Sequence, residues 1–156
     1  MARKYLVAVP KGGCGKTTTV HNLGMAFAEQ GRRVLFVDTD PQGNLSSILG
    51  FAHTSGAPTL YTALREFTMN RKDVLPSTIY HVQEGVDLVP ANMLLNRAND
   101  ELASQMKREY ILKRLLESVE EHYDAILIDT LPYLGVLVNN ALERCSQRLS
   151  CVIVYT

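Results

Sequence analysis

The segment from Lys11 to Thr18, Lys-Gly-Gly-Cys-Gly-Lys-Thr-Thr, constrains this chain more than any other feature. It follows a short apolar run, residues 4–9, and precedes a helical pattern over residues 17–30 that ends before Gly31. A glycine-rich turn between a buried strand and a helix can wrap consecutive backbone N–H groups around a polyphosphate. We therefore expect a phosphate-binding loop that consists of Gly12, Gly13, Cys14, Gly15, Lys16, Thr17 and Thr18.

Each residue type in this loop suits the binding of phosphate or of a metal ion. Glycines let the backbone approach phosphate oxygens, Lys16 can reach the terminal phosphates, and the Thr17 hydroxyl is placed to hold Mg²⁺. The strict GxxxxGK[ST] pattern has glycine where this chain has Pro10, so the loop is a variant. Its second lysine, Lys11, suggests a charge offered to another nucleotide across a subunit interface, with a solvated lysine as the alternative.

Alternating strand and helix patterns predict an α/β fold, and the loop at 11–18 makes it resemble the P-loop NTPase type. Residues 4–9, 33–37 and 124–129 are apolar runs expected of parallel strands buried on both faces, and the last two end at or before an aspartate. We expect one domain over residues 1–156, a mostly parallel sheet with helices on both faces. Further strands are expected at 86–89 and 151–155, a loop at 54–58, and helices at 45–49, 59–67, 91–102, 106–121 and 136–144.

Composition limits the partners that this chain can attract. The 156 residues are 46% hydrophobic and carry 16 basic and 16 acidic side chains, so net charge gives no overall attraction to nucleic acid or anionic membranes. No apolar run approaches the roughly 18–20 residues of a spanning helix. The cysteines Cys14, Cys145 and Cys151 form no CxxC pair, which favours reduced thiols. We expect a cytoplasmic protein without membrane contact.

Three motifs in order resemble the deviant Walker A ATPases of the ParA/MinD group, and among them the ParA/Soj partition proteins. They are the loop at 11–18, Val-Asp-Thr-Asp-Pro-Gln-Gly-Asn at 37–44, and Tyr-Asp-Ala-Ile-Leu-Ile-Asp at 123–129. The similarity runs from residue 4 to the end of the chain. It implies an ATPase that binds ATP together with Mg²⁺.

The resemblance implies catalytic roles for three residues. Lys11 would act in trans on the ATP of a partner subunit, Lys16 would bind the phosphates, and Asp40 would position the attacking water. Thr18 is implied to contact a phosphate. These roles agree with phosphoryl transfer, which needs an oriented water and positive charge against the developing oxyanion.

A metal site is implied at Thr17, Asp38 and Asp129, with Asp129 as the Walker B carboxylate. Both aspartates end predicted parallel strands, and ligands of open α/β sheets bind beyond those ends. An alternative remains for each carboxylate. For Asp38 and Asp40 it is capping of the helix expected at Leu45, and for Asp129 it is simple termination of the strand.

The chain departs from the family pattern at three places. Leu131 and Tyr133 replace a proline and a serine after the Walker B motif, which puts the coupling of that segment in question. Cys14 replaces a small aliphatic residue, and it is either an activated thiol at a helix N-terminus or inert packing. Partition ATPases of this type usually continue for roughly another hundred residues, so their full length exceeds that of this chain. We therefore expect an N-terminal part, with a naturally short gene as the alternative.

The favoured function is a partition ATPase that is weak alone, dimerises on ATP and is stimulated by a centromere-binding, ParB-like partner in plasmid or chromosome segregation. Nonspecific DNA binding and nucleoid association are expected of a full-length form, whereas residues 1–156 should bind DNA weakly. A MinD-like positioning ATPase and a non-catalytic nucleotide-binding or dimerising module are alternatives. An iron protein of the nitrogenase type needs interface cysteines that Cys145 and Cys151 do not match.

Overall fold

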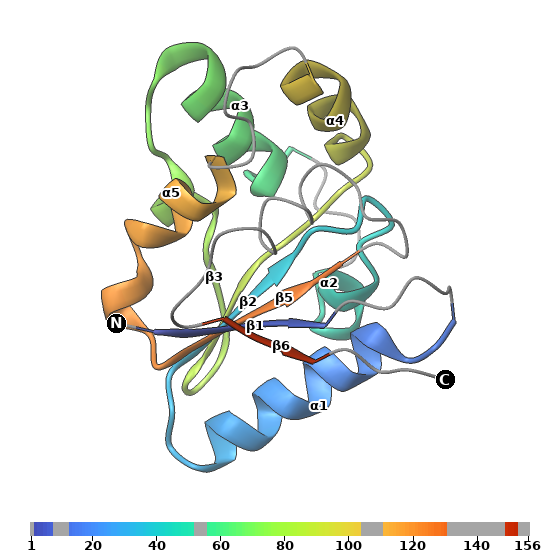
Figure 1. Ribbon diagram of the computed structural model, residues 1–156, viewed down its shortest axis with the longest axis vertical. Helices are drawn as coiled ribbons and strands as arrows, with labels where there is room; N and C mark the ends of the chain where they lie inside the picture. Colours follow the sequence, from blue (N-terminus) through green and yellow to red (C-terminus); the bar gives the residue numbers. More distant parts are fainter. Residues whose placement is uncertain (1, 8–12, 52–55, 104–110, 131–148, 153–156) are drawn as a thin grey trace.

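The computed structural model describes residues 2–7, 13–51, 56–103, 111–130 and 149–152. Its centre is a six-stranded sheet with the order β3-β4-β2-β5-β1-β6, in which β3 alone runs antiparallel to its neighbour. The strands are β1 (Arg3–Val7), β2 (Val34–Asp38), β3 (Tyr80–Gln83), β4 (Val86–Val89), β5 (Ala125–Asp129) and β6 (Leu149–Val152). This arrangement, seen in Figure 1, confirms the predicted α/β class.

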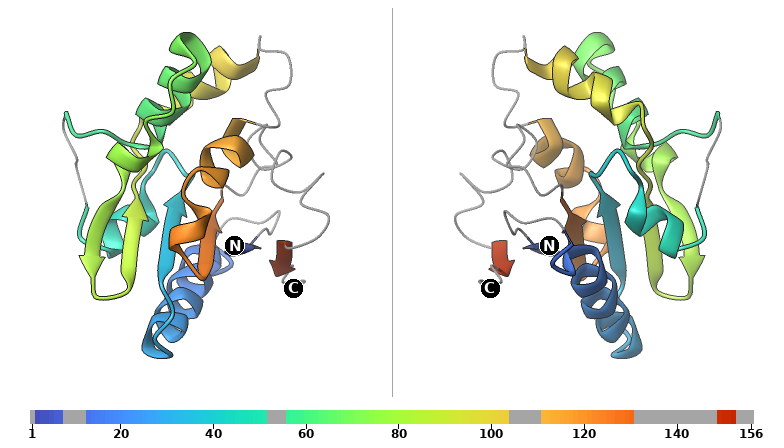
Figure 2. Two further views of the ribbon diagram at one scale, coloured as in Figure 1. Left: turned by 90° about the vertical axis from the view of Figure 1, so that its left-hand side faces the viewer. Right: turned by 90° about the vertical axis from the view of Figure 1, so that its right-hand side faces the viewer.

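Helices cover both faces of the sheet (Figure 2). One face carries α1 (Lys16–Glu29) and α2 (Asn44–Ile48), and the other carries α3 (Leu60–Asn70) and α5 (Ile111–Glu117). The helix α4 (Leu95–Ala103) packs beside α3, and the short 3-10 turns η1 (Leu75–Thr78) and η3 (Glu120–His122) complete the described elements.

The strand β2 shows how the sequence builds these two layers. Its five residues are all buried, with Val34 and Phe36 packed toward α1 and Leu35 and Val37 toward the opposite helices. Successive side chains of a strand point to opposite faces, so a strand covered on both sides needs an unbroken apolar run. This explains why residues 33–37 lack the polar alternation of a half-exposed strand.

A glycine lets α1 lie close to the sheet. A Cβ atom built at Gly24 would lie 2.2 Å from Cζ of Phe36, closer than any real carbon contact. Gly24 is buried in the middle of α1, so the ring of Phe36 fills the space that a side chain would occupy. The close contact fixes α1, and with it the residues at its N-terminus, against β2.

Most predicted elements are confirmed, with shifted ends. The helices expected at 45–49 and 59–67 are α2 and α3. The helix expected from residue 91 begins at Leu95, and the one expected to reach residue 121 ends at Glu117 before η3. The strand expected at 151–155 begins earlier, at Leu149. The predicted helix at 136–144 and parts of the other segments lie outside the described residues.

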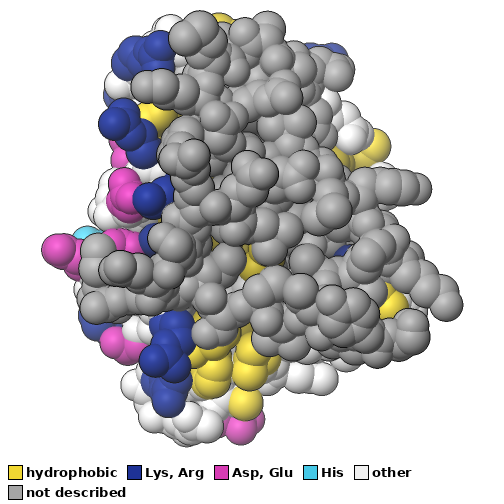
Figure 3. Space-filling model, in the orientation of Figure 1, with side chains coloured by type: hydrophobic (Ala, Val, Ile, Leu, Met, Phe, Trp, Pro, Cys, Tyr) yellow, Lys and Arg dark blue, Asp and Glu magenta, His cyan; other side chains and the backbone are white. Residues whose placement is uncertain are grey.

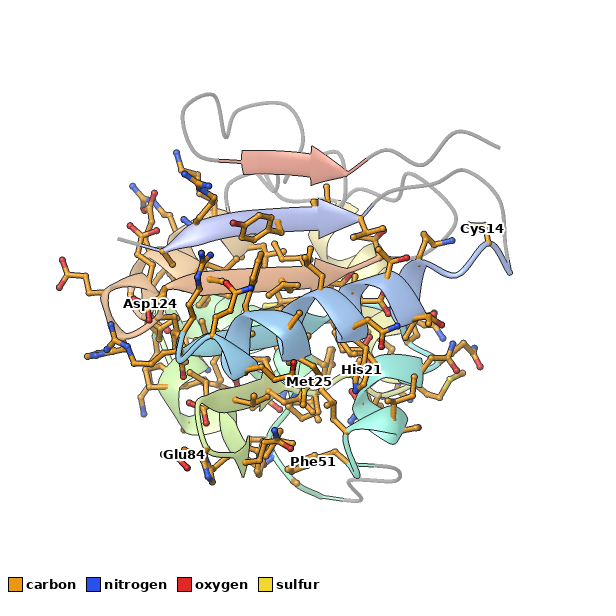
Figure 4. The ribbon with its side chains drawn as sticks, turned by 90° about the horizontal axis from the view of Figure 1, so that it is seen from below. Cys14, His21, Met25, Phe51, Glu84 and Asp124 are labelled. Carbon is orange, nitrogen blue, oxygen red and sulfur yellow. The ribbon has the colours of Figure 1, made fainter. Side chains whose placement is uncertain are left out.

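The strand register brings the three motifs together at the carboxyl ends of the parallel strands. Val7, the last residue of β1, and Asp38, the last residue of β2, both pair with Asp129 at the end of β5. The residues from Gly13 to Gly15 lead into α1 at the same edge of the sheet, where Cys14 is labelled in Figure 4. The three predicted motifs therefore meet beyond the carboxyl ends of three adjacent parallel strands.

Candidate functional site

The loop before α1 has the backbone shape that its glycines predict. Gly13 and Gly15 both have left-handed conformations, with φ of 69° and 82°, which other residues adopt only with strain. Gly15 is the N-cap of α1, and its carbonyl accepts hydrogen bonds from the amide and the hydroxyl of Thr19. The helix N-terminus is thereby held at the edge of the sheet. Lys11 and Gly12 lie outside the described residues.

Lys16 is the first residue of α1 and is buried despite its charge. Its ammonium Nζ lies 3.8 Å from Sγ of Cys14, so the side chain folds back over the loop. Cys14 is half-buried and Thr18, two residues into the helix, is exposed. The predicted phosphate lysine therefore lies within the turn that it is expected to serve.

Thr17 and Asp129 are in direct contact. The Thr17 hydroxyl donates to Oδ2 of Asp129 over 2.7 Å, and the Thr130 amide donates to Oδ1 over 3.1 Å. Asp129 is fully buried at the end of β5. Two of the three residues predicted to hold a metal, 112 positions apart in the sequence, are thus brought together.

The environment of Asp129 disfavours its negative charge. Burial, together with the nearby carboxylates of Asp38 and Asp40, raises the pKa of Asp129 to about 7, although the hydrogen bonds from Thr17 and Thr130 oppose the shift. A carboxyl that is costly to ionise alone gains most from a cation beside it. The site therefore has the electrostatic character of a cation-binding position.

Asp38 is held by three donors from its own chain. Its Oδ2 accepts hydrogen bonds from the amide and the hydroxyl of Ser46, at 2.8 and 2.7 Å, and its Oδ1 accepts one from the Asp40 amide at 3.0 Å. Burial raises the pKa of Asp38, and these hydrogen bonds oppose the shift. Because Ser46 lies in the first turn of α2, the geometry supports the capping alternative. The role of Asp38 as a metal ligand stays a prediction.

Asp40 organises the turn that leads into α2. Its Oδ1 accepts the Gln42 amide at 2.9 Å, its carbonyl accepts the Gly43 amide at 2.8 Å, and Nδ2 of Asn44 lies 3.5 Å from its Oδ2. The side chain is buried at the same edge as Asp129. Its predicted role, the orientation of a water molecule, stays a prediction.

Two threonines that the sequence did not single out tie the strand ends together. The amide and hydroxyl of Thr39 both donate to the carbonyl of Asp129, the hydroxyl over 2.6 Å. The Thr130 hydroxyl donates to the carbonyl of Val7 over 3.0 Å. These bonds link the ends of β1, β2 and β5. The signal in the sequence that could have pointed to them is that Thr39 and Thr130 directly follow the strand-ending Asp38 and Asp129.

The oxygen atoms of Thr17 and Asp129 fit Mg²⁺. This ion takes oxygen ligands, retains several waters, and is usually held through one or two carboxylates together with substrate phosphates. Within the part of the chain that the structure describes, no group of three or more His, Cys, Asp or Glu side chains converges as a metal site. A hydroxyl and one carboxylate are the donor set expected where a nucleotide completes the coordination.

Several other predictions fall on residues that the structure does not describe. They concern the trans role of Lys11, the altered segment at Leu131 and Tyr133, and the thiol of Cys145. As to membranes, none of the helices within the described ranges has the length and apolar character needed to span one.

Comparisons with known proteins show the family to which the chain belongs. A family described as "AAA domain" matches residues 2–154. The sporulation initiation inhibitor protein Soj of Bacillus subtilis is 42% identical over 142 residues, which cover 91% of this chain and 54% of Soj. The chromosome partitioning protein ParA of Caulobacter vibrioides is 40% identical over 142 residues, 90% of this chain and 52% of that protein. The chain spans about half the length of the curated relatives it matches.

Solved structures give the same fold. Cobyrinic acid a,c-diamide synthase from Mycobacterium smegmatis, with a bound ATP analogue and magnesium, has a TM-score of 0.82 and 42% identity, covering 91% of this chain and 56% of its own. An ATP complex of a Cyanothece McdA variant has a TM-score of 0.80 and 30% identity, covering 90% of this chain and 52% of that one.

Proposed function

Because this chain belongs to the AAA-domain family and is similar to Soj and ParA over most of its length, we propose that it binds ATP with Mg²⁺ and hydrolyses ATP in a partition system. The observation that carries the proposal is the 2.7 Å contact between Thr17 and Asp129. It joins the start of the helix after the glycine loop to the end of a parallel strand, where phosphates and a cation bind in open α/β sheets.

The candidate site residues have the following parts in this proposal. Backbone amides of the glycine loop and the N-terminus of α1 bind the phosphates, with Lys16 and the hydroxyl of Thr18 as side-chain contacts. Thr17 and Asp129 hold the metal. Mg²⁺ bound there would supply positive charge against the negative charge of the phosphates.

Asp40 is proposed to orient the attacking water. It is buried beside Asp129, and its carboxylate is fixed by the Gln42 amide, so it is held rather than free to rotate. An oriented water is the main requirement of in-line attack on a terminal phosphate, where positioning and charge supply most of the catalysis. Asp38 contributes by fixing the start of the same turn.

Dimerisation, the stimulating partner and the role in segregation are proposed on the likeness to ParA and Soj. Lys11 is assigned to the nucleotide of a second copy, because Lys16 is buried in the loop of its own chain. A ParB-like stimulator is the proposed partner. The sequence at 37–44 favours this branch over a MinD-like positioning ATPase.

Nonspecific DNA binding is proposed for a full-length form only. Along the left side of Figure 3, Lys and Arg side chains alternate with Asp and Glu side chains among the described residues. Such a mixed surface gives little of the phosphate-contact energy on which nonspecific binding depends. The 156 residues, with balanced charge, are therefore expected to bind DNA weakly.

Phosphate release and nucleotide binding, measured on the same preparations, test the hydrolysis assignment. Asp40→Ala should keep Mg-ATP binding and lose turnover, because Lys16 and the metal ligands remain. Asn96→Ala, at an exposed position on α4, is the matched control and should behave as the wild type. Wild-type turnover in Asp40→Ala would contradict the role of Asp40.

Nucleotide affinity and size in solution test the assignment of Lys11. Lys11→Ala should keep ATP affinity and lose ATP-dependent dimerisation, whereas Lys16→Ala should lose ATP affinity itself. Equal loss of affinity in the two variants would show that both lysines serve the same nucleotide, and the trans assignment would fail.

A further inference from the structure

The hydroxyl of Ser46 makes two hydrogen bonds at the edge where the motifs meet. It donates to Oδ2 of Asp38 over 2.7 Å and accepts the Ala91 amide over 3.0 Å. Ser46 is 1% exposed, and Asp38 and Ala91 are also buried. A hydroxyl has one proton to donate, so its proton is committed to Asp38 while a lone pair serves Ala91.

This serine closes the loop that carries Asp40. Asp38 stands at the start of the loop, at the end of β2, and Ser46 stands eight residues later in α2. The carboxylate of Asp38 also accepts the Asp40 amide, so one side chain holds both the closing residue and the backbone of Asp40. The loop is thereby fastened at both ends around Asp40.

A second contact ties the loop to the segment after β4. The left-handed Gly43 lies beside this segment, since a Cβ atom there would be in ordinary contact, at 3.4 Å, with the carbonyl oxygen of Ala91. Ser46 accepts the amide of the same Ala91. Both peptide groups of Ala91 thus face the loop, and Ser46 is the side chain that connects Asp38 with this second support.

We infer that Ser46 is a positioning residue, whose hydroxyl links Asp38 to Ala91 and so fixes the loop that carries Asp40 for ATP hydrolysis. The inference rests on the proposed function, because it concerns the water-orienting role of Asp40. Removal of the hydroxyl leaves the buried Ala91 amide without this acceptor and takes one of the two Ser46 donors from Asp38. Lys16, Thr17 and Asp129 are untouched, so turnover should suffer more than nucleotide binding.

The test compares Ser46→Ala with Ser46→Thr, which retains the hydroxyl, and with Ser47→Ala, its exposed neighbour in α2. Phosphate release, ATP affinity and backbone amide exchange over residues 40–46 are measured for each. Ser46→Ala should lower the maximal rate about tenfold to a hundredfold, since a misplacement of about 1 Å costs on the order of a hundredfold. Its ATP affinity should stay close to wild type, and its amides at 40–46 should exchange faster.

Ser46→Thr should restore most of the rate and the protection, and Ser47→Ala should match the wild type. Wild-type rate and exchange in Ser46→Ala would overturn the inference, as would equal losses in Ser46→Ala and Ser46→Thr. A parallel loss of ATP affinity and rate would also overturn it, because that indicates general damage. If the wild-type chain hydrolyses no ATP, the proposed function fails, and amide exchange alone then decides whether Ser46 holds the loop.

Discussion

Charged side chains have different partners at the two ends of the parallel strands, which we call the amino edge and the carboxyl edge of the central sheet. At the amino edge, Lys4 forms a buried ion pair with Glu120, and Arg33 donates to Asp124 from two side-chain nitrogens and from its backbone amide. At the carboxyl edge, the hydrogen bonds to Asp38 and Asp129 come from hydroxyls and backbone amides. Asp124 and Cys14 mark these opposite edges in Figure 4.

The pKa values follow the same division. Hydrogen bonds from Arg33 lower the pKa of Asp124, whereas burial raises the pKa of Asp38 and Asp129. At the amino edge, the four side chains of the two ion pairs each have a partner of opposite charge within the chain. At the carboxyl edge the buried carboxyls have no ion-pair partner among the contacts described above, and a bound cation, as proposed above, would stabilise their charged forms. The first edge therefore serves stability, and the second is available for ligand binding.

The largest expected effect is at the amino edge. Lys4→Met removes one partner of a buried pair, in which the side chains of Lys4 and Glu120 are 12% and 6% exposed, and leaves an uncompensated charge. We expect the free energy of unfolding, from urea denaturation, to fall by about 3 to 5 kcal/mol. The double variant Lys4→Met/Glu120→Leu should recover most of it. A loss below about 1 kcal/mol, typical of an exposed pair, would contradict the assignment.

A smaller effect with a distinct pH dependence is expected at the carboxyl edge. The folded-state pKa of Asp129, about 7, lies above the ordinary value of 3.8, so the folded state binds the proton more tightly. The unliganded wild type should therefore lose stability as pH rises from about 4 to about 7, by at most roughly 1.4 kcal/mol per pH unit from this group.

The asparagine of the Asp129→Asn variant cannot ionise, so this variant should not lose stability from that group as pH rises. Its stability relative to wild type, from denaturation at fixed pH values, should rise through that window by no more than about 4 kcal/mol and level off above about pH 8. A difference that stays constant from pH 4 to 8 would show that Asp129 titrates normally.

The smallest effect is expected for the exposed pair at the amino edge. The side chains of Arg33 and Asp124 are 58% and 45% exposed, so solvent and salt screen their attraction. Arg33→Ala should lower the free energy of unfolding by roughly 0.5 kcal/mol or less near neutral pH. The lowered pKa of Asp124 makes this contribution present above pH 3.8 and lost as pH falls. A loss as large as that of Lys4→Met would remove the distinction between the two pairs.

Sequence patterns predicted the carboxyl edge well because its elements are buried. The runs at 33–37 and 124–129 are central strands, and their apolar residues cannot be mistaken for an exposed segment. The glycine loop placed the start of α1 to within one residue. Parallel strands then bring the motifs to one edge without further information.

Exposed and long-range features were harder to predict. The edge strand β3 was not predicted, because it is half-exposed and polar and has no apolar run; the Glu84-Gly85 turn before β4 was the available signal. Helix α4 begins four residues later than expected, after the segment in which Ala91 bonds to Ser46. That bond joins positions 45 residues apart, and no local pattern encodes it.

The central claim is that the carboxyl edge is the nucleotide site, and an equilibrium titration of the chain with ATP, with and without Mg²⁺, tests it most directly. Lys16→Ala should weaken Mg-ATP binding by about tenfold or more, since a hydrogen bond to a charged group contributes about 1.5–3 kcal/mol. Arg33→Ala, at the amino edge, should bind as the wild type does, and Mg²⁺ should tighten binding in the wild type. Equal affinity in wild type and Lys16→Ala, or affinity that does not respond to Mg²⁺, would contradict the account.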